Sequence, residues 1–222
     1  MPRNRAEIGA EKRQRTKLTI VRSAFHLFDH IDVGRITIDD VIKSAAISRG
    51  SFYNYFLTLE DMIKYLAAEI SGQINKEQSI YFENTVDMAE KICLNSRYFL
   101  YRAISDLACS NILLRAMPLV GALNDQMQDH ARLGFQEAMR RGAIAVPSAD
   151  LALEVGYGIA ISVIRRRINN SYVEGDIEDA GFLLMRMFGV DEAKAKTIST
   201  IPIKMPETPL RDSLFIESLP QS

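Results

Sequence analysis

The sequence has no tryptophan, only two cysteines and seven prolines among its 222 residues, and no long hydrophobic run. A helix that spans a bilayer needs about 20 largely apolar residues in a row, so no membrane span is expected. Residues 1–5 also lack the apolar segment of a secretion signal, which favours a cytoplasmic protein. Cys93 and Cys109 lie apart from any CxxC or Cys/His grouping, so they are expected to be small buried residues without a disulfide or zinc.

An excess of charge of one sign is also lacking, because 27 Lys and Arg are balanced by 28 Asp and Glu. The balance is uneven along the chain, since residues 1–56 hold ten basic and six acidic side chains, with the excess in residues 1–22. A basic N-terminal arm of this kind is suited to lie near a polyanion, and a solvated terminus is the alternative. With 47% hydrophobic and 25% charged residues, the composition is that of an ordinary soluble globular protein.

Apolar residues recur at helical spacing over almost the whole sequence, and the alternation typical of strands is nearly absent. This pattern predicts an all-α protein, with a first helix at about 12–30. A long helix from 59 onwards, and later helices at about 118–140, 148–168 and 176–188, follow from the same spacing.

Three further helix starts lie close together after the first helix. Thr37 with Asp40 and Thr58 with Asp61 form capping boxes, in which each side chain can bond to the backbone of the other residue. Ser48 can cap a helix between them. The two helices that begin at the first two caps must therefore be short.

These short helices, expected at about 38–45 and 49–55, are joined by a tight turn and form a helix-turn-helix. In DNA-binding proteins of this type the second helix lies in the major groove. The candidate contacts are residues that can bond to bases or phosphates, or that allow a close approach: Thr37, Arg49, Gly50, Ser51, Tyr53, Asn54 and Tyr55. For Tyr55, partial burial at the edge of the core is an equal alternative.

The segment 20–62 resembles the N-terminal domain of TetR-family transcriptional regulators. Its centre reads AFHLFDHIDVGRITIDDVIKSAAISRGSFYNYFLTLEDM. The resemblance implies a homodimer that binds a palindromic operator, usually as a repressor, and is released by a small ligand in a larger C-terminal helical domain. By position, it also implies DNA contacts at Thr37, Arg49, Gly50, Ser51, Tyr53 and Tyr55.

Three positions depart from the family pattern. Leu59 stands where a lysine often contacts phosphate, Ile36 replaces the first of two threonines, and Ala46 replaces the usual glycine of the turn. We hypothesise that the basic N-terminal arm compensates for the contact that Leu59 cannot make.

The chain is expected to have three parts. Residues 1–56 form the basic arm and the DNA-binding domain, and residues 57–198 form the regulatory and dimerisation domain, with the long helix as the connector. Residues 199–222 are a proline-rich C-terminal tail.

The last two long helices, at about 148–168 and 176–188, are the expected homodimer interface, since the family pairs these helices across the dimer. The first of them carries a face of small and β-branched residues that suits close packing: Ala152, Val155, Gly156, Ile159, Ala160 and Val163. Burial of this face within one chain is the alternative.

A small apolar or aromatic effector is the expected ligand, held among the helices of the C-terminal part. The candidates are aromatic and methionine side chains: Tyr98, Tyr101, Met117, Met127, Phe135 and Tyr157. The same residue types also fill an ordinary helical core, and a chain without a ligand is the alternative.

The sequence contains no phosphate-binding loop, nucleophile elbow, HExxH motif or dinucleotide fingerprint, so neither an enzyme nor a cofactor is expected. His26 and His30 lie one helical turn apart with Asp29 nearby, but no fourth ligand is evident, so no metal site is predicted.

The alternative function is a helical ligand-sensing or adaptor protein whose helix-turn-helix binds protein instead of DNA. Leu59 and the near-neutral total charge favour it. The exposed donors at Arg49, Ser51, Tyr53 and Asn54, together with the basic arm, favour DNA.

Overall fold

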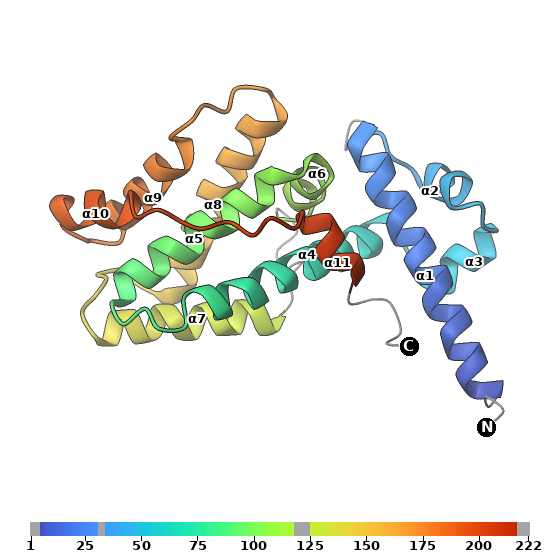
Figure 1. The fold of residues 1–222 in the computed structure, drawn as a ribbon, viewed down its shortest axis with the longest axis horizontal. Coiled ribbons are helices and arrows are strands. Elements are labelled where there is room, and N and C mark those ends of the chain that lie inside the picture. The colour runs from blue at the N-terminus through green and yellow to red at the C-terminus, as the bar shows by residue number, and fades with distance from the viewer. Residues whose placement is uncertain (1–4, 31–33, 118–124, 217–222) are drawn as a thin grey trace.

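The computed structural model describes residues 5–30, 34–117 and 125–216, and helix is the only regular structure within these ranges (Figure 1). The predicted all-α fold class is therefore confirmed. None of the described helices has both the length and the apolar content that crossing a membrane requires. The helices are α1 (Arg5–His30), α2 (Ile38–Ala45), α3 (Arg49–Tyr53), α4 (Leu59–Tyr81), α5 (Met88–Ser105), α6 (Leu107–Ala116), α7 (Asp125–Arg140), α8 (Ala149–Ile168), α9 (Asp176–Met187), α10 (Glu192–Ser199) and α11 (Leu210–Ile216).

At one end of the molecule, α1, α2 and α3 form a small N-terminal bundle (Figure 1). Phe28 of α1, Val41 of α2 and Phe52 of α3 are fully buried in its core. Helices as short as α2 and α3 are marginal in water on their own, so burial of these side chains against α1 keeps them folded.

Both short helices begin at the predicted caps. The Thr37 hydroxyl accepts from the backbone N–H of Asp40, and the Asp40 carboxylate accepts from the Thr37 N–H at 2.9 Å. The Ser48 hydroxyl accepts from the Ser51 N–H at 3.1 Å, and Thr58 forms a second capping box at the start of α4. These contacts join residues three apart in sequence, which is why the sequence located the three starts.

The 23 residues of α4 connect the N-terminal bundle to the larger C-terminal domain. Met62 and Ile63 near its start, and Ile70 and Ile74 further along, are all fully buried in one continuous core. A helix of this length extends about 35 Å, so α4 contributes to both ends of the molecule.

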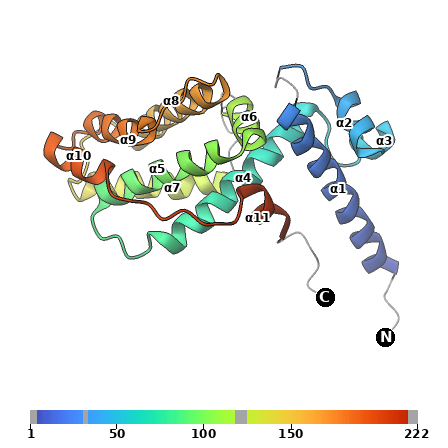
Figure 2. The same ribbon diagram turned by 45° about the horizontal axis from the view of Figure 1, so that its top comes forward.

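The C-terminal domain is built around α5, which contacts α4, α6, α7, α8, α9 and α10. In Figures 1 and 2, α8 and α9 lie on one side of α5, and α4 and α7 lie on the other. Cys93 of α5 and Cys109 of α6 are buried free thiols, as predicted.

After α10 the chain returns along α5 to α11, which packs on α4 (Figure 2). We call residues 200–216 the C-terminal strap. Arg97 of α5 donates to the Ile201 carbonyl at 2.8 Å, and Arg102 donates to the Thr208 carbonyl at 3.1 Å. Leu210 is fully buried. The sequence predicted an extended tail here, and the structure adds that the tail is bound and includes α11.

Other helix bounds differ from the prediction. The first helix begins at Arg5 and not near 12, because residues 5–12 have adequate helix propensity but no apolar stripe for the periodicity to detect. The helix at 49 ends at Tyr53 and not at 55, and α10 was not predicted. The predicted start of the helix at 118 falls in residues 118–124, outside the described residues.

Candidate nucleic-acid interface and ligand cavity

The turn between α2 and α3 depends on Ala46. This residue has φ 52° and ψ 43°, in the left-handed region, and its N–H bonds to the carbonyls of Ile42 and Lys43. The left-handed conformation ends α2 abruptly and lets Ser48 begin α3 two residues later. α2 and α3 therefore have the short, tightly joined arrangement of a helix-turn-helix.

Arg49, the first residue of α3, forms an ion pair with Asp39 of α2. The two side chains are 60% and 58% exposed, so water competes with this pair and the guanidinium stays accessible. The hydrogen bond that Arg49 donates to Asp39 raises the pKa of Arg49, so the side chain remains cationic. Asp39 was missed in the sequence because acidic residues in the first turn of a helix are explained by the helix dipole alone.

The Ser51 hydroxyl lies 2.8 Å from the Ser48 hydroxyl, and one of the two donates to the other. Tyr53 is 41% exposed, and Asn54 caps the end of α3 with an exposed side chain. At Gly50, an added Cβ would lie 4.0 Å from its nearest neighbour, the Ser48 Oγ, so the outer side of α3 is open. Of the predicted donors of α3, Arg49, Tyr53 and Asn54 are thus exposed, and Ser51 is half-buried.

Thr37 and Tyr55 are more constrained than the other candidates. Hydrogen bonds from the side chain and backbone of Thr37 hold the pKa of Asp40 below its ordinary value, so the Thr37 hydroxyl is engaged in the capping box. Tyr55 is half-buried and lines a groove of about 560 Å³ with Arg13 and Lys17 of α1. The structure therefore favours the alternative of partial burial for Tyr55.

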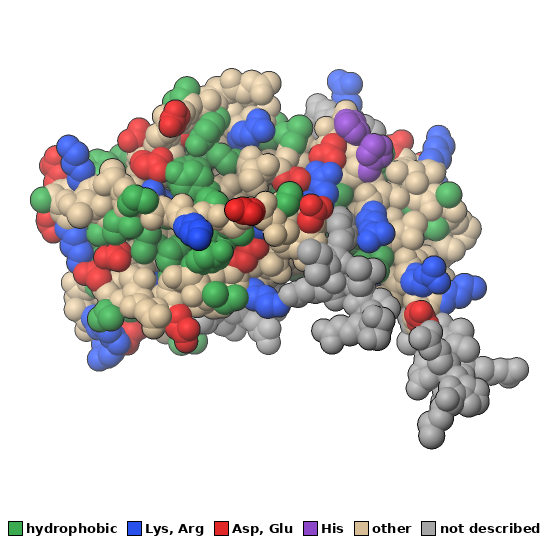
Figure 3. Space-filling view, viewed as in Figure 1, with side chains coloured by type: hydrophobic (Ala, Val, Ile, Leu, Met, Phe, Trp, Pro, Cys, Tyr) green, Lys and Arg blue, Asp and Glu red, His purple; other side chains and the backbone are tan. Residues whose placement is uncertain are grey.

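The arm extends α1 beyond the bundle, and Lys12, Arg13 and Arg15 on it are exposed. Figure 3 shows Lys and Arg side chains along this helix on one face of the molecule. Because Arg13 lines the same groove as Tyr55, these cations lie beside the end of α3. The basic segment is thus a helix that carries positive charge next to the helix-turn-helix.

A second cavity, of about 470 Å³, lies in the C-terminal domain among α4, α5, α7, α8 and α9. Its apolar wall includes Ile92, Phe99, Leu100, Phe135, Leu153 and Leu184. Its polar groups include Ser71, Asn75, Gln78, Asn95, Ser96 and Tyr157. A cavity of this size, mainly apolar with a few polar groups, has the usual character of a small-molecule site.

Of the six ligand candidates from the sequence, Phe135 and Tyr157 line this cavity, and burial raises the pKa of the Tyr157 hydroxyl. Tyr98 is fully buried and donates to Glu77 at 2.8 Å, while Tyr101 donates to Glu178. Burial and the bond to Glu178 raise the pKa of Tyr101 to about 12.

The remaining two candidates are the methionines. Met117 is buried at the end of α6, outside the cavity lining. The side chain of Met127 lies outside the described residues. The structure thus brings together two of the five candidates whose side chains it describes, and it adds Ser71 and Asn95, which carry no motif in the sequence.

The small-residue face of α8 is buried within the chain only in part. Ala152, Ala160 and Val163 are buried, whereas Val155, Gly156 and Ile159 are half-buried. The exposed apolar side chains of the helix pair lie elsewhere, at Leu151 of α8 and at Leu183 and Met187 of α9, which are 51%, 56% and 58% exposed.

His26, Asp29 and His30 of α1 have their potential ligand atoms within 4.8 Å of one another. Both oxygens of Asp29 already accept hydrogen bonds from Arg211 of α11, at 2.6 and 2.7 Å. The two imidazoles lie edge to face at the surface, where Figure 3 shows the histidine pair. Arg211 therefore competes with any metal for the carboxylate of this group.

Comparison with solved structures gives matches over most of the chain. RolR in complex with resorcinol has a TM-score of 0.71 and 22% sequence identity, over 88% of this chain and 98% of RolR. The TetR-family protein CprB from S. coelicolor A3(2) has a TM-score of 0.55 and 16% identity, over 85% of this chain and 96% of CprB. The chain has the fold of the TetR-family regulators. FadR from Bacillus subtilis, solved with stearoyl-CoA, also shares it, with a TM-score of 0.61, 16% identity, and coverage of 77% and 98%.

No protein-family profile and no curated protein matches the sequence. The TetR fold is therefore established by structure at low sequence identity. It contains an N-terminal helix-turn-helix domain and a C-terminal helical domain, which is the architecture predicted from the sequence.

Two of the three departures from the TetR sequence pattern are explained by packing. Leu59 is 8% exposed and Ile36 is 3% exposed, and both belong to the main hydrophobic core. Neither side chain is available for a phosphate. At the third position, Ala46 adopts the conformation that glycine adopts most easily.

Proposed function

We propose that this protein is a DNA-binding transcriptional regulator, acting as a homodimeric repressor on a palindromic operator and released by a small apolar or aromatic effector. The exposed polar surface of α3 carries the proposal. Arg49, Ser51, Tyr53 and Asn54 offer donors and acceptors on this helix, and Arg49, Tyr53 and Asn54 are exposed. A role in regulation, and not in catalysis, is proposed.

DNA binding requires Arg49 to exchange Asp39 for a guanine edge or a phosphate. The exchange costs little, because the Arg49–Asp39 pair is exposed and such pairs contribute little to stability. A bidentate contact from arginine to guanine is worth about 1–3 kcal/mol of discrimination between bases. The cations of α1 would add contacts to phosphate, which do not depend on sequence.

Selection from a random duplex library at near-physiological salt tests the proposal. We expect the purified protein to enrich an inverted repeat, and the double variant Arg49→Ala, Ser51→Ala to lose it. Arg140→Ala is the matched control, because it removes an exposed arginine at the end of α7, away from α3. The control should select the same repeat.

Absence of enrichment by protein that mass spectrometry shows to be free of bound small molecules would overturn the proposal. The alternative function, a ligand-sensing or adaptor protein whose helix-turn-helix binds protein, would then remain. A repeat that the double variant still selects would show that α3 does not read the DNA.

The homodimer is proposed to form through α8 and α9, within residues 148–168 and 176–188. The exposed apolar side chains of Leu151, Leu183 and Met187 on these two helices support this surface, because an interface with a second copy would bury them. We expect the chain to sediment as a dimer, and Leu183→Glu to shift it to a monomer. A monomeric unmodified chain at micromolar concentration would contradict this assignment.

The cavity among α4, α5, α7, α8 and α9 is the proposed effector site. RolR was solved with resorcinol and FadR with stearoyl-CoA, so this fold holds small molecules of different sizes in those proteins. In this chain α4 links the cavity to the helix-turn-helix. Ser71 of α4 lines the cavity. Tyr65 of the same helix packs against Phe56, with 5.6 Å between the ring centres, and the Lys17 Nζ lies 3.7 Å from the centre of the Tyr65 ring.

This linkage gives a physical route for release from DNA. A ligand that binds better to one position of α4 than to another shifts the population of α4 positions. Because Tyr65 contacts both the C-terminal side of α3 and the arm of α1, such a shift changes how the DNA-binding surface is presented.

A further inference from the structure

The C-terminal end of α1 brings two imidazoles and a carboxylate together at the surface. His26 and His30 are exposed and lie four residues apart, and Asp29 between them is half-buried. Their potential ligand atoms all lie within 4.8 Å of one another, and these three form the one such group among the residues that the structure describes. None of them belongs to α2 or α3, and none lines the cavity of the C-terminal domain.

We propose that His26, Asp29 and His30 form a binding site for a divalent transition-metal ion such as Zn²⁺ or Ni²⁺. The site is separate from the surface of α3 and from the effector cavity, so it does not depend on the proposed function. Two histidines four residues apart share one face of a helix, and this arrangement binds zinc in other proteins. Imidazole nitrogens suit Zn²⁺ and Ni²⁺, whereas Mg²⁺ takes oxygen ligands.

The geometry requires only small movements of side chains. Ligand atoms at about 2.0–2.2 Å from one Zn²⁺ ion lie about 3–4 Å from one another. The separation of up to 4.8 Å in this group exceeds that by about 1 Å, and the exposed imidazoles of His26 and His30 can rotate to close it.

The sequence predicted no metal site because no fourth protein ligand is evident. Zinc also binds to three protein ligands with water in the fourth position, so the missing residue does not prevent binding. The position in the helix favours a cation as well. His30 lies in the last turn of α1, where the free carbonyl groups carry a partial negative charge.

Arg211 of the C-terminal strap already holds the carboxylate of the site. Its guanidinium donates to both oxygens of Asp29, at 2.6 and 2.7 Å, and it also donates to Asp106 at 2.9 Å. A metal ion therefore has to share the Asp29 carboxylate with Arg211, and the two cations repel each other. Asp106 keeps the guanidinium paired when the metal takes an oxygen of Asp29.

Metal binding and the contact between the strap and α1 therefore oppose each other. Because such coupling is reciprocal, an arginine that weakens metal binding is itself held less firmly when the metal is bound. Arg211 thus acts on the metal through Asp29, and the strap should loosen from α1 when the site is filled.

Calorimetric titration of the full chain, without a histidine tag, tests the site at about pH 7.5, where ordinary histidines are neutral and can bind metals. We expect Zn²⁺ and Ni²⁺ to bind at least a hundredfold more tightly than Mg²⁺. His26→Gln and His30→Gln should each weaken Zn²⁺ binding at least tenfold and, because both positions are exposed, leave the Tm of the metal-free chain unchanged. Asp29→Asn should also weaken it.

His130→Gln is the matched control, because His130 is the third histidine of the chain and lies in α7. It should leave the affinity for Zn²⁺ unchanged.

Arg211→Ala separates a positioning role from a structural one. We expect this variant to bind Zn²⁺ at least fivefold more tightly, because Asp29 is then free for the metal. A purely structural arginine would change the Tm alone. In the unmodified chain, added Zn²⁺ should speed hydrogen exchange of the backbone amides of α11.

Three results would overturn the proposal. They are Zn²⁺ binding no tighter than Mg²⁺ binding, an affinity for Zn²⁺ that His26→Gln and His30→Gln leave unchanged, and an Arg211→Ala chain that binds Zn²⁺ no more tightly than the unmodified one.

Discussion

Ala46 is the residue at which the helix-turn-helix carries backbone strain. Its φ of 52° is in the left-handed region, where a Cβ is disfavoured, and the turn between α2 and α3 requires that conformation. Glycine adopts it without the steric cost. Alanine in place of the family's glycine therefore lowers the stability of the fold, at a position that makes no predicted DNA contact.

We expect Ala46→Gly to raise the free energy of unfolding by about 1 kcal/mol, because it removes the left-handed penalty. Ala45→Gly is the control. Ala45 is the last residue of α2 and is helical, so glycine there should lower stability by about 1 kcal/mol. Urea unfolding of both variants measures the difference, and equal effects at 45 and 46 would contradict the assignment of strain to Ala46.

Asp39 shows what a single residue adds to the interface. It holds Arg49 by an exposed ion pair in the absence of DNA, ten residues away in sequence. The hydrophobic pattern of α2 gives no sign of this partner. The DNA-contacting candidates could thus be predicted from the sequence, but the state of Arg49 before binding could not.

At the scale of elements, α5 and α9 are joined through Arg97. This side chain is 2% exposed, and it donates to Glu178 of α9 at 2.9 Å and to the Ile201 carbonyl at 2.8 Å. Burial opposes the charge of Glu178, but the hydrogen bonds from Tyr101 and Arg97 outweigh it and hold its pKa below the ordinary value. Gly181 of α9 leaves the space through which Arg97 passes.

We expect Gly181→Ala to lower the free energy of unfolding by about 1–3 kcal/mol, as overpacking does. An added Cβ would lie 2.8 Å from the Arg97 Cδ. The Arg97 guanidinium is hydrogen-bonded to the Ile201 carbonyl and to Glu178, so the side chain cannot move aside without loss of these bonds. Gly72→Ala in α4 is the matched control, because its Cβ meets nothing within 4 Å. The control should be stabilised by about 1 kcal/mol, since alanine is the better helix former.

Thermal and urea unfolding measure both glycine variants. A stabilised Gly181→Ala would show that Arg97 moves aside at no cost, and that the α5–α9 contact is looser than the structure indicates. The sequence predicted α9 as a helix at about 176–188 from the spacing of its apolar residues. It did not predict the contact of α9 with α5, which depends on a glycine and an arginine far apart in the chain.

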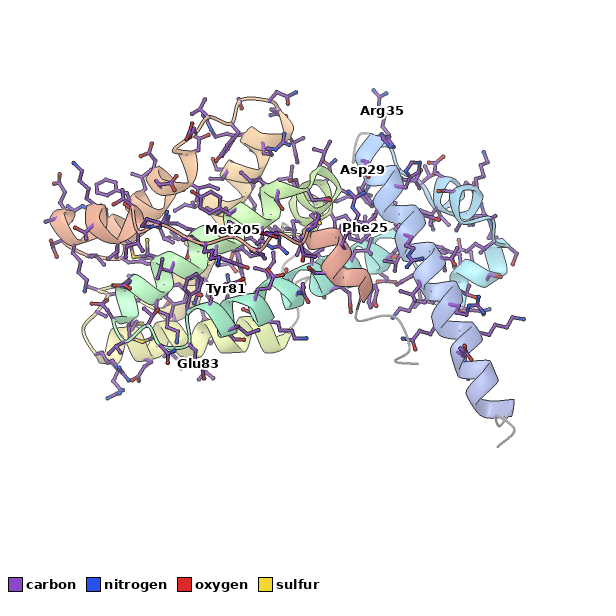
Figure 4. All side chains as sticks on the ribbon, in the orientation of Figure 1. Phe25, Asp29, Arg35, Tyr81, Glu83 and Met205 are labelled. Atoms are coloured by element: carbon purple, nitrogen blue, oxygen red, sulfur yellow. The ribbon has the colours of Figure 1, made fainter. Side chains whose placement is uncertain are left out.

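At the scale of the whole molecule, Arg211 connects the two domains. It bonds both oxygens of Asp29 on α1, and it also donates to Asp106, which caps α6, at 2.9 Å. Its guanidinium lies 5.6 Å from the centre of the Phe25 ring. Figure 4 shows Phe25 and Asp29 on the side of α1 that faces α11. The hydrogen bonds that Arg211 donates to both carboxylates raise the pKa of Arg211, so the contact stays charged.

We expect Arg211→Ala to lower the free energy of unfolding by about 1–3 kcal/mol. The loss leaves the carboxylates of Asp29 and Asp106 facing each other without a cation, and it is smaller than for a fully buried pair because the Arg211 side chain is 28% exposed. Urea unfolding measures it. Arg140→Ala, which removes a 71% exposed arginine, should stay within about 0.5 kcal/mol of the unmodified protein.

A second comparison separates charge from packing at Arg211. Replacing Asp29 and Asp106 by asparagine in the Arg211→Ala background should recover part of the lost stability, because it removes the repulsion. An Arg211→Ala chain as stable as the unmodified one would mean that Leu210, which is fully buried, holds the strap in place alone.

The sequence by itself determined the local features of this protein. The caps at Thr37, Ser48 and Thr58 fixed three helix starts, and the short helices between them predicted the helix-turn-helix with its exposed donors. These features depend on hydrogen bonds between residues three apart and on the period of the helix, both of which can be read within a short window of sequence.

Only the tertiary structure shows where the cavity lies, how much of the small face of α8 is buried, and how the C-terminal strap is bound. Of the five predicted ligand residues whose side chains the structure describes, two line the cavity, because helical periodicity marks an apolar side without saying whether it meets a neighbour or an open space. The strap is held by contacts such as Arg211 with Asp29, which are 182 residues apart. Such pairs leave no periodic signal, since they form only when folding brings distant segments together.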